Sequence, residues 1–224
     1  MRKSIQNWTA SLLKRHIQSD VRTQLRGIWI RGTIPTGPGV IAINHHSWWD
    51  GYLTAMLAWH NQHAFGILMD DTNLKETAFL RTLGVLGTQE LRKALSLLRQ
   101  GHWIFIFPEG RLCPTGPLQN IRSGAGWLAK TANVPLYPLA LRTVLRGHQY
   151  PEAYLEMGSA TTSDNLKHDL SNLLTQLDLN LNLHDPERPL PGFRPLVLGR
   201  KSAQERNKTA GMWLNHLLGD MQKP

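Results

Sequence analysis

The chain has 224 residues, of which 41% are hydrophobic and 18% charged, a composition typical of one folded domain and not of a disordered chain. Its 25 lysines and arginines against 16 aspartates and glutamates give a formal net charge of +9, which favours an anionic partner: nucleic acid, an acidic membrane or phosphorylated substrates. Cys113 is the only cysteine, which excludes an internal disulfide and favours a reducing compartment.

Hydropathy along the chain predicts no membrane-spanning helix, because no apolar run approaches the ~20 residues that such a helix needs. The N-terminus has the basic start of a signal peptide but lacks its apolar middle. We therefore expect a cytosolic protein, either soluble or attached to the cytoplasmic face of the cell membrane as a peripheral protein.

Residues 1–26 predict a basic amphipathic helix. Apolar residues fall on one side of this helix at helical spacing: Ile5, Trp8, Leu12, Leu13 and Ile17. The rest carries six cations and one acid: Arg2, Lys3, Lys14, Arg15, Arg22, Arg26 and Asp20. Such a helix can lie in a membrane interface with its cations toward anionic head groups, or it can pack on the domain with a solvated basic face.

Short apolar runs alternate with helical patterns through the rest of the chain. Strands are expected at residues 28–30, 40–43, 64–69, 103–107, 134–142 and 154–157. Helices are expected at residues 52–59, 76–83, 89–99, 124–132, 165–179 and 203–218. The prolines in the fifth strand suggest an edge strand or an irregular start. Residues 184–200, rich in proline and basic residues, are expected to be irregular.

This alternation predicts an α/β fold, with a largely parallel central sheet covered by helices on both faces. We expect a single domain made of an amphipathic, membrane-associating helix (1–26), a catalytic core (27–160) and a helical C-terminal appendage (161–224) too small to fold alone. Ligands of such sheets bind at the carboxyl ends of the strands, where two polar motifs are predicted to lie.

The first motif directly follows the apolar run of residues 40–43 and reads Asn44-His45-His46-Ser47-Trp48-Trp49-Asp50. It places an imidazole at the end of a strand and a carboxylate at the start of a helix, close enough for a hydrogen bond. An oriented imidazole of this kind can take a proton from a hydroxyl. His45 and His46 are neighbours, so in an extended chain only one ring is expected to reach Asp50.

Two other kinds of chemistry fit this motif poorly. The opposed histidines give poor geometry for a metal, and no further ligand cluster is present, so we expect no metal ion. Ser47 lacks the Gly-x-Ser-x-Gly turn of a serine nucleophile.

The second motif, Phe107-Pro108-Glu109-Gly110-Arg111, ends another apolar run. The guanidinium of Arg111 can grip phosphate oxygens in a bidentate manner, and Glu109 can accept a hydrogen bond from a hydroxyl. Gly110 lets the backbone approach a ligand closely.

In this order and spacing the pieces resemble the glycerolipid acyltransferase family, the lysophosphatidic acid and lysophospholipid acyltransferases. The family's Asn-His-x-x-x-x-Asp motif is matched by Asn44, His45 and Asp50, and its Phe-Pro-Glu-Gly motif by residues 107–111. Its Val-Pro-(apolar)-x-Pro-(apolar) motif is matched by residues 134–139, and the preceding Gly-Ala helix by residues 122–129. The resemblance covers roughly residues 27–160.

Two departures from the family pattern bear on the acceptor. Arg111 directly follows Phe-Pro-Glu-Gly, where many members have Thr-Arg-Ser, and this version is similar to the acyltransferase part of the 2-acylglycerophosphoethanolamine enzymes. The family's second motif, a strand that closes on a phosphate-gripping basic residue, is shortened over residues 84–93. Arg92 is its nearest match.

By this resemblance the chain transfers an acyl group from a thioester, acyl-CoA or acyl-carrier protein, to a lipid hydroxyl without a prosthetic group. His45 is implied as the general base and Asp50 as the group that holds it. The implied substrate-binding residues are Glu109, Gly110, Arg111, Arg92 and Arg122. The acyl-channel candidates are Trp48, Trp49, Val134 and Pro135. The implied partners are a lipid acceptor in an anionic membrane and the acyl donor.

Three alternatives stay open. The same transfer can serve a non-phosphate acceptor, such as a carotenoid glycoside or another glycolipid. A non-catalytic basic membrane-binding protein would fit the charge, but it would not need a base and its carboxylate; a nucleic-acid binder lacks any base-reading motif. A hydrolase results if water replaces the acceptor.

Overall fold

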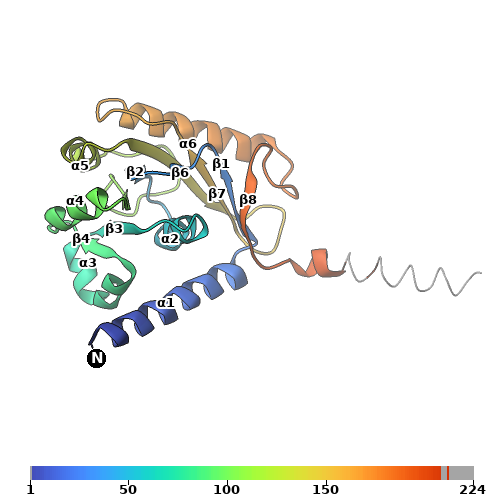
Figure 1. Ribbon diagram of the computed structural model, residues 1–224. Helices are drawn as coiled ribbons and strands as arrows, with labels where there is room; N and C mark the ends of the chain where they lie inside the picture. The colour runs from blue at the N-terminus through green and yellow to red at the C-terminus, as the bar shows by residue number, and fades with distance from the viewer. Residues whose placement is uncertain (1, 208–210, 212–224) are drawn as a thin grey trace, which may run out of the picture.

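The computed structural model describes residues 2–207 and 211, with side chains from residue 7 on. The helices are α1 (Arg2–Gln24), α2 (Asp50–His60), α3 (Asp71–Glu76), the 3₁₀ helix η1 (Ala78–Leu83), α4 (Leu91–Arg99), α5 (Gly124–Ala132) and α6 (Leu166–Leu183). The strands are β1 (Gly27–Arg31), β2 (Gly39–Ile43), β3 (Phe65–Met69), β4 (Val85–Gly87), β5 (Trp103–Ile106), β6 (Leu136–Val144), β7 (Glu152–Met157) and β8 (Arg194–Leu198). Helices lie on both sides of the sheet that these strands form (Figure 1).

The sheet has eight strands in the order β4-β3-β5-β2-β6-β7-β1-β8. The pairs β4–β3, β3–β5, β5–β2, β2–β6 and β7–β1 are parallel. The pairs β6–β7 and β1–β8 are antiparallel. The expected α/β fold with a largely parallel sheet is therefore confirmed. The carboxyl ends of β2, β5 and β6 meet at one edge.

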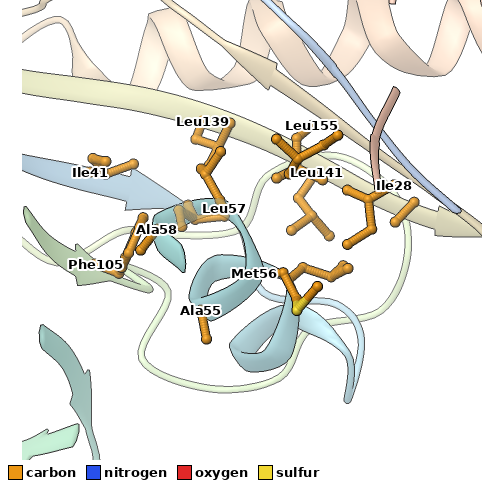
Figure 2. Close-up of a cluster of buried hydrophobic side chains, with 14 of the residues drawn as sticks. Ile28, Ile41, Ala55, Met56, Leu57, Ala58, Phe105, Leu139, Leu141 and Leu155 are labelled. Atoms are coloured by element: carbon orange, nitrogen blue, oxygen red, sulfur yellow. The ribbon is translucent and has the colours of Figure 1, made fainter. Parts of the chain in front are cut away.

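The larger core lies between the sheet and the layer formed by α1 and α2. Helix α2 is apolar on most of its surface, and Figure 2 shows its residue Leu57 beside Leu139 of β6 and its residue Ala58 beside Phe105 of β5. The opposite face of the sheet carries two smaller clusters under α4, α5 and α6. Side chains alternate between these faces along each strand, which explains why β2 and β5 are continuous apolar runs.

Helix α1 divides into two parts. Ile17, Val21 and Leu25 are buried, and the last two belong to the α1–α2 core cluster. Trp8 and Leu12, nearer the N-terminus, are exposed. The packed-helix interpretation therefore describes the buried part of α1, which also contacts η1, while Trp8 and Leu12 leave an apolar surface open to solvent nearer the N-terminus.

The prediction that the proline-containing strand is an edge strand is wrong, because β6 lies between β2 and β7. Pro135 precedes the strand, in agreement with an irregular start. Pro138 lies beyond Met157, the last residue of β7 paired with β6, and its carbonyl accepts a hydrogen bond from the Gly158 N–H. Since a residue's N–H and C=O point to the same side of a strand, the missing N–H faces a place where β7 has already ended.

Residues 184–200 were expected to be irregular, but they contain β8, which pairs with β1 and completes the sheet. Pro195 sits in this edge strand, where a missing N–H is tolerated. Helix α6 packs on β6, so the segment from residue 161 contributes both a strand and a core-facing helix. The predicted last helix begins at residue 203 and is described to residue 207; most of its remainder lies outside the described residues.

The prediction of a single α-helix at residues 76–83 is also wrong. Helix α3 ends at Glu76, and the next turns form the 3₁₀ helix η1. Gly84 follows with φ +93°, and the glycine-flanked patch after it is the short strand β4.

Candidate active site

Asn44 fastens the end of β2 to the middle of β6. Its side-chain Nδ2 donates to the Leu141 carbonyl at 3.0 Å, and its Oδ1 accepts from the Leu141 N–H at 2.8 Å. The Asn44 side chain is buried, so it replaces a ladder hydrogen-bond pair where the chain turns away from the sheet. The asparagine at the first position of the motif therefore has a structural task in this chain.

Replacing Asn44 by Ala is expected to reduce the free energy of unfolding by about 2–4 kcal/mol, because the Leu141 N–H and carbonyl both lose a buried partner. Chemical denaturation measures this loss. The matched change Asn172→Ala, on the exposed side of α6, should shift stability by less than about 0.5 kcal/mol. Equal stabilities for the two variants would contradict the bridging role of Asn44.

His45 and Asp50 form the hydrogen bond that the motif predicts. The distance from His45 Nδ1 to Asp50 Oδ2 is 2.8 Å. Asp50 is fully buried at the start of α2, whereas 27% of the His45 side chain is exposed. Because an ionised carboxylate can only accept, His45 carries a proton on Nδ1, which leaves Nε2 free to take a proton. The Phe107 ring stacks on the imidazole with centroids 4.4 Å apart.

The Asp50 carboxylate also builds the turn that presents His45. Oδ2 accepts from the backbone N–H of His46 at 2.8 Å and of Ser47 at 2.9 Å. The same oxygen therefore holds the imidazole and two amides. The other oxygen, Oδ1, is buried without a hydrogen-bond partner among the described residues.

His46 was expected to point away from Asp50, and its ring is indeed held by β6. Its Nε2 accepts from the Thr143 N–H at 3.1 Å, so this nitrogen carries no proton. Burial lowers the pKa of His46, which agrees with a neutral ring. Its Nδ1 still lies 3.9 Å from Asp50 Oδ1, too far for a hydrogen bond.

Glu109 joins the two predicted motifs. Its Oε2 accepts from the His45 N–H at 2.8 Å and its Oε1 from the Gln119 N–H at 3.0 Å. The His45 carbonyl accepts from the Cys113 N–H at 2.7 Å, and burial raises the pKa of that thiol. The hydroxyl-binding role of Glu109 stays a prediction, since the observed partners of this buried carboxylate are two backbone amides and the Cys113 thiol.

A small pocket lies between His45, Glu109 and α6. It has a volume of about 10 Å³ and is also lined by Cys113, Arg142 and Leu174. That volume holds about one water molecule and is too small for a fatty chain. The open surface next to His45 is therefore its exposed side, where 27% of the side chain contacts solvent.

Gly110, Arg111 and Arg122 lie together beside Glu109. The Arg122 N–H donates to the Pro108 carbonyl at 2.8 Å, which closes the loop between β5 and α5. Gly110 has φ +69°, and a Cβ there would lie 2.9 Å from Cζ of Arg122. Both arginines are exposed, so their guanidinium groups are available to an anion.

The remaining predicted residues lie farther from the imidazole. Arg92, exposed in the first turn of α4, is at the same sheet edge. However, β4 lies three strands from β2, about 14 Å away. Val134 and Pro135 precede β6 and therefore lie at the amino ends of the parallel strands, whereas His45 lies at the carboxyl ends.

Trp48 and Trp49, which are neighbours in the sequence, lie in different environments. Trp49 packs against the α1–α2 core cluster, whereas Trp48 is exposed. The acyl-channel role of both residues, and of Val134 and Pro135, stays a prediction.

Sequence reasoning missed Thr143, Cys113, Gln119 and Arg142. The first three act through backbone N–H groups, which leave no trace in residue type. Arg142 is almost fully buried, and its guanidinium contacts Asp178 and the Gly116 carbonyl. An arginine inside an apolar strand run, at residues 136–144, was the one available signal.

Metal binding has no support in the part of the chain that the structure describes. No group of three or more His, Cys, Asp or Glu side chains there is arranged to hold an ion. The expected independence from metal stays a prediction.

Comparison with known proteins gives three findings. A family model described as Acyltransferase matches residues 27–142. A curated 1-acyl-sn-glycerol-3-phosphate acyltransferase of Pseudomonas aeruginosa is 28% identical over 161 residues, 66% of this chain. The chain spans 60% of the length of that relative.

The fold is similar to that in the crystal structure of the 1-acyl-sn-glycerophosphate (LPA) acyltransferase, PlsC, from Thermotoga maritima. The TM-score is 0.53, the identity is 15%, and the match covers 79% of each chain, so this likeness shows the fold alone. The family model covers just over half of the 224 residues, including both motifs around His45. The resemblance drawn from the motifs is thus confirmed, and the chain belongs to the Acyltransferase family.

Proposed function

We propose that the chain is an O-acyltransferase that moves a fatty acyl group from acyl-CoA or acyl-carrier protein to a hydroxyl of lysophosphatidic acid or another lysophospholipid. The observation that carries this proposal is the 2.8 Å hydrogen bond between His45 Nδ1 and the buried Asp50 carboxylate, with the imidazole partly exposed. That arrangement presents a base, Nε2, at the carboxyl edge of the sheet.

The reaction follows from this geometry. Nε2 of His45 takes the proton of the acceptor hydroxyl as the oxygen forms a bond to the thioester carbonyl carbon. Asp50 stabilises the imidazolium that results. When the carbon–sulfur bond breaks, the imidazolium returns its proton to the leaving thiolate. The products are an ester and a free thiol, and no covalent acyl-enzyme is needed.

Glycerol phosphate as part of the acceptor is supported by the function of the Pseudomonas aeruginosa relative, a 1-acyl-sn-glycerol-3-phosphate acyltransferase, and by two exposed arginines beside Gly110. Purified protein should be assayed against lysophosphatidate, lysophosphatidylethanolamine and a glycolipid, each with acyl-CoA and with acyl-carrier protein. We expect turnover with a lysophospholipid. Turnover with the glycolipid alone would overturn this choice of acceptor.

Arg122 offers a sharper test of the acceptor. Arg122→Ala is expected to raise KM for lysophosphatidate about tenfold and to change KM for an uncharged monoacylglycerol little, because the guanidinium serves only the phosphate. Arg99→Ala, at the exposed end of α4, is the matched control. Equal effects on both acceptors would contradict a phosphate-binding role.

A non-phosphate acceptor is the second candidate, and one observation favours it. Where the resemblance implies a cation after β4, the chain has Thr88 and Gln89, both bonded to the Asp71 carboxylate. A carboxylate at this place repels phosphate. A glycolipid such as a carotenoid glycoside would avoid this repulsion.

Peripheral attachment to the cytoplasmic membrane face is part of the proposal. No helix among the described residues is long and apolar enough to cross a membrane. Removing residues 1–26 would not test attachment cleanly, because Val21 and Leu25 belong to the core.

The variant Trp8→Ser/Leu12→Ser leaves that core intact and is expected to bind anionic vesicles about tenfold more weakly, since two exposed apolar groups of α1 are lost. Vesicle flotation measures the bound fraction. Leu179→Ser, an exposed leucine on α6, serves as control. Unchanged flotation of the double variant would rule out docking through α1.

A further inference from the structure

Three large apolar side chains are exposed at the carboxyl edge of the sheet, each on a different loop. Trp48, between β2 and α2, is 66% exposed; Leu112, between β5 and α5, is 55% exposed; and Leu145, after β6, is 67% exposed. A folded chain gains nothing from such exposure, and clustered exposed apolar residues commonly mark an interaction site. We call these three residues the apolar rim.

Backbone contacts place the rim around the reactive imidazole. Leu112 adjoins Cys113, whose N–H donates to the His45 carbonyl at 2.7 Å. Leu145 lies two residues beyond Thr143, whose N–H donates to His46 Nε2 at 3.1 Å.

Trp48 belongs to the same turn as these histidines. Its ring lies 5.3 Å from that of Trp49 and 4.7 Å from that of Tyr52. Those contacts hold Trp48 in place while most of its surface stays open.

Two residues of the rim, Trp48 and Leu145, lie toward the side of the molecule that carries α1 and α2, whereas the loop of Leu112 runs along the carboxyl edge between them and α6. In β6, Leu139 and Leu141 point into the α1–α2 core, and Val144 packs on the opposite, α6 side. Continuing this alternation directs Leu145 to the α1–α2 side. Trp48 closely precedes α2, and α1 packs against α2, so α1 lies on the same side of the sheet as this turn.

Charge around the rim fits an anionic surface. Arg111 and Arg122 are exposed and form no ion pair with any described acid. The two acids nearest the imidazole, Asp50 and Glu109, are buried and held by backbone amides. Exposed leucine and tryptophan beside arginine is the composition of a surface that enters a head-group layer.

We infer that the apolar rim inserts into an anionic lipid bilayer and places the mouth of the active site against the membrane. This inference rests on the proposed function, because a lipid acceptor gives the contact its purpose. It adds a second attachment point, on the β2–α2, β5–α5 and β6–β7 loops, to the one proposed for α1. The acceptor then reaches His45 without crossing water.

The test compares two double variants of the full chain in flotation with vesicles of phosphatidylglycerol and phosphatidylcholine. Leu112→Ser/Leu145→Ser is expected to lower the partition coefficient about tenfold, since two leucines no longer enter the lipid. Leu179→Ser/Leu198→Ser is the matched control, because these leucines are 48% and 69% exposed on α6 and β8. The control should retain parent binding. A third variant, Leu145→Trp, should increase partitioning.

Equal binding of the two double variants, or no increase with Leu145→Trp, would overturn the inference. So would a loss of self-association in vesicle-free solution with Leu112→Ser/Leu145→Ser, because the rim would then bind a second copy of the chain. Thermal unfolding of each variant identifies any that fails to fold. The partition measurement needs no turnover, so its result stands apart from the outcome of the acyl-transfer assays.

Discussion

His45→Ala is expected to lower kcat/KM for acyl transfer about 10³-fold, equal to about 4 kcal/mol of transition-state stabilisation. Among the described residues, the imidazole is the one base at this edge of the sheet that is held by a buried carboxylate and has an exposed face. Without it, the acceptor hydroxyl must lose its proton to water. The fold should survive, because the hydrogen bonds that anchor His45 to Glu109 and Cys113 use its backbone.

The control for this change is His60→Ala, an exposed histidine in the last turn of α2. It should retain parent activity. Product formation followed by mass spectrometry compares the two variants under the same conditions. A folded His45→Ala protein with parent kcat/KM would remove the base from the account.

Asp50 should show two separable losses. In Asp50→Asn, the amide oxygen can replace Oδ2 as the acceptor for the His46 and Ser47 N–H groups, and the new NH₂ takes the place of Oδ1, which has no partner. The turn is kept and the charge is lost. Activity is expected to fall on the order of 10³-fold because the imidazolium is no longer stabilised, while the free energy of unfolding changes by less than about 1 kcal/mol.

Asp50→Ala removes the acceptor as well as the charge. Two partly buried amides then lose their partner, which is expected to cost about 2 kcal/mol of stability in addition to the same loss of activity. Denaturant unfolding and turnover measured on both variants separate the two effects. If the Asn variant were as active as the parent, Asp50 would be a turn-forming residue without a part in the reaction.

The sequence predicts the local parts of this structure well. Residues 40–43 and 103–106 are apolar runs of strand length, and both are buried strands. His45 and Asp50 are five residues apart, so the strand, turn and helix around them nearly determine their contact. Periodicity and spacing are local properties, and they report local geometry.

Long-range pairing was harder to predict. Strand β8 pairs with β1, which lies more than 160 residues earlier in the chain. Because the segment of β8 contains Pro195, its sequence predicted irregular structure. Pro138 led to the opposite error, since it predicted an edge strand where the structure has the interior strand β6. The proline is tolerated there because it lies just beyond the end of the paired part of β7. Proline reports a missing N–H, but only the assembled sheet shows whether a neighbour needed that N–H.

The site shows the same limit. The sequence predicts that Glu109 lies near His45, since both follow strands that end at one edge. It does not show that the Glu109 carboxylate bonds to the backbone of His45, because a carboxylate suits a substrate hydroxyl equally well. The exposed side chains of Trp48, Leu112 and Leu145 likewise depend on three loops meeting.

The most direct test of the account counts two products in one reaction. Purified protein is given acyl-CoA and a lysophospholipid, and the thiol released is compared with the ester formed. The account predicts one new ester for each thiol, with both rates lost in His45→Ala. Thiol release accompanied by free fatty acid and no ester would contradict it and make the chain a hydrolase.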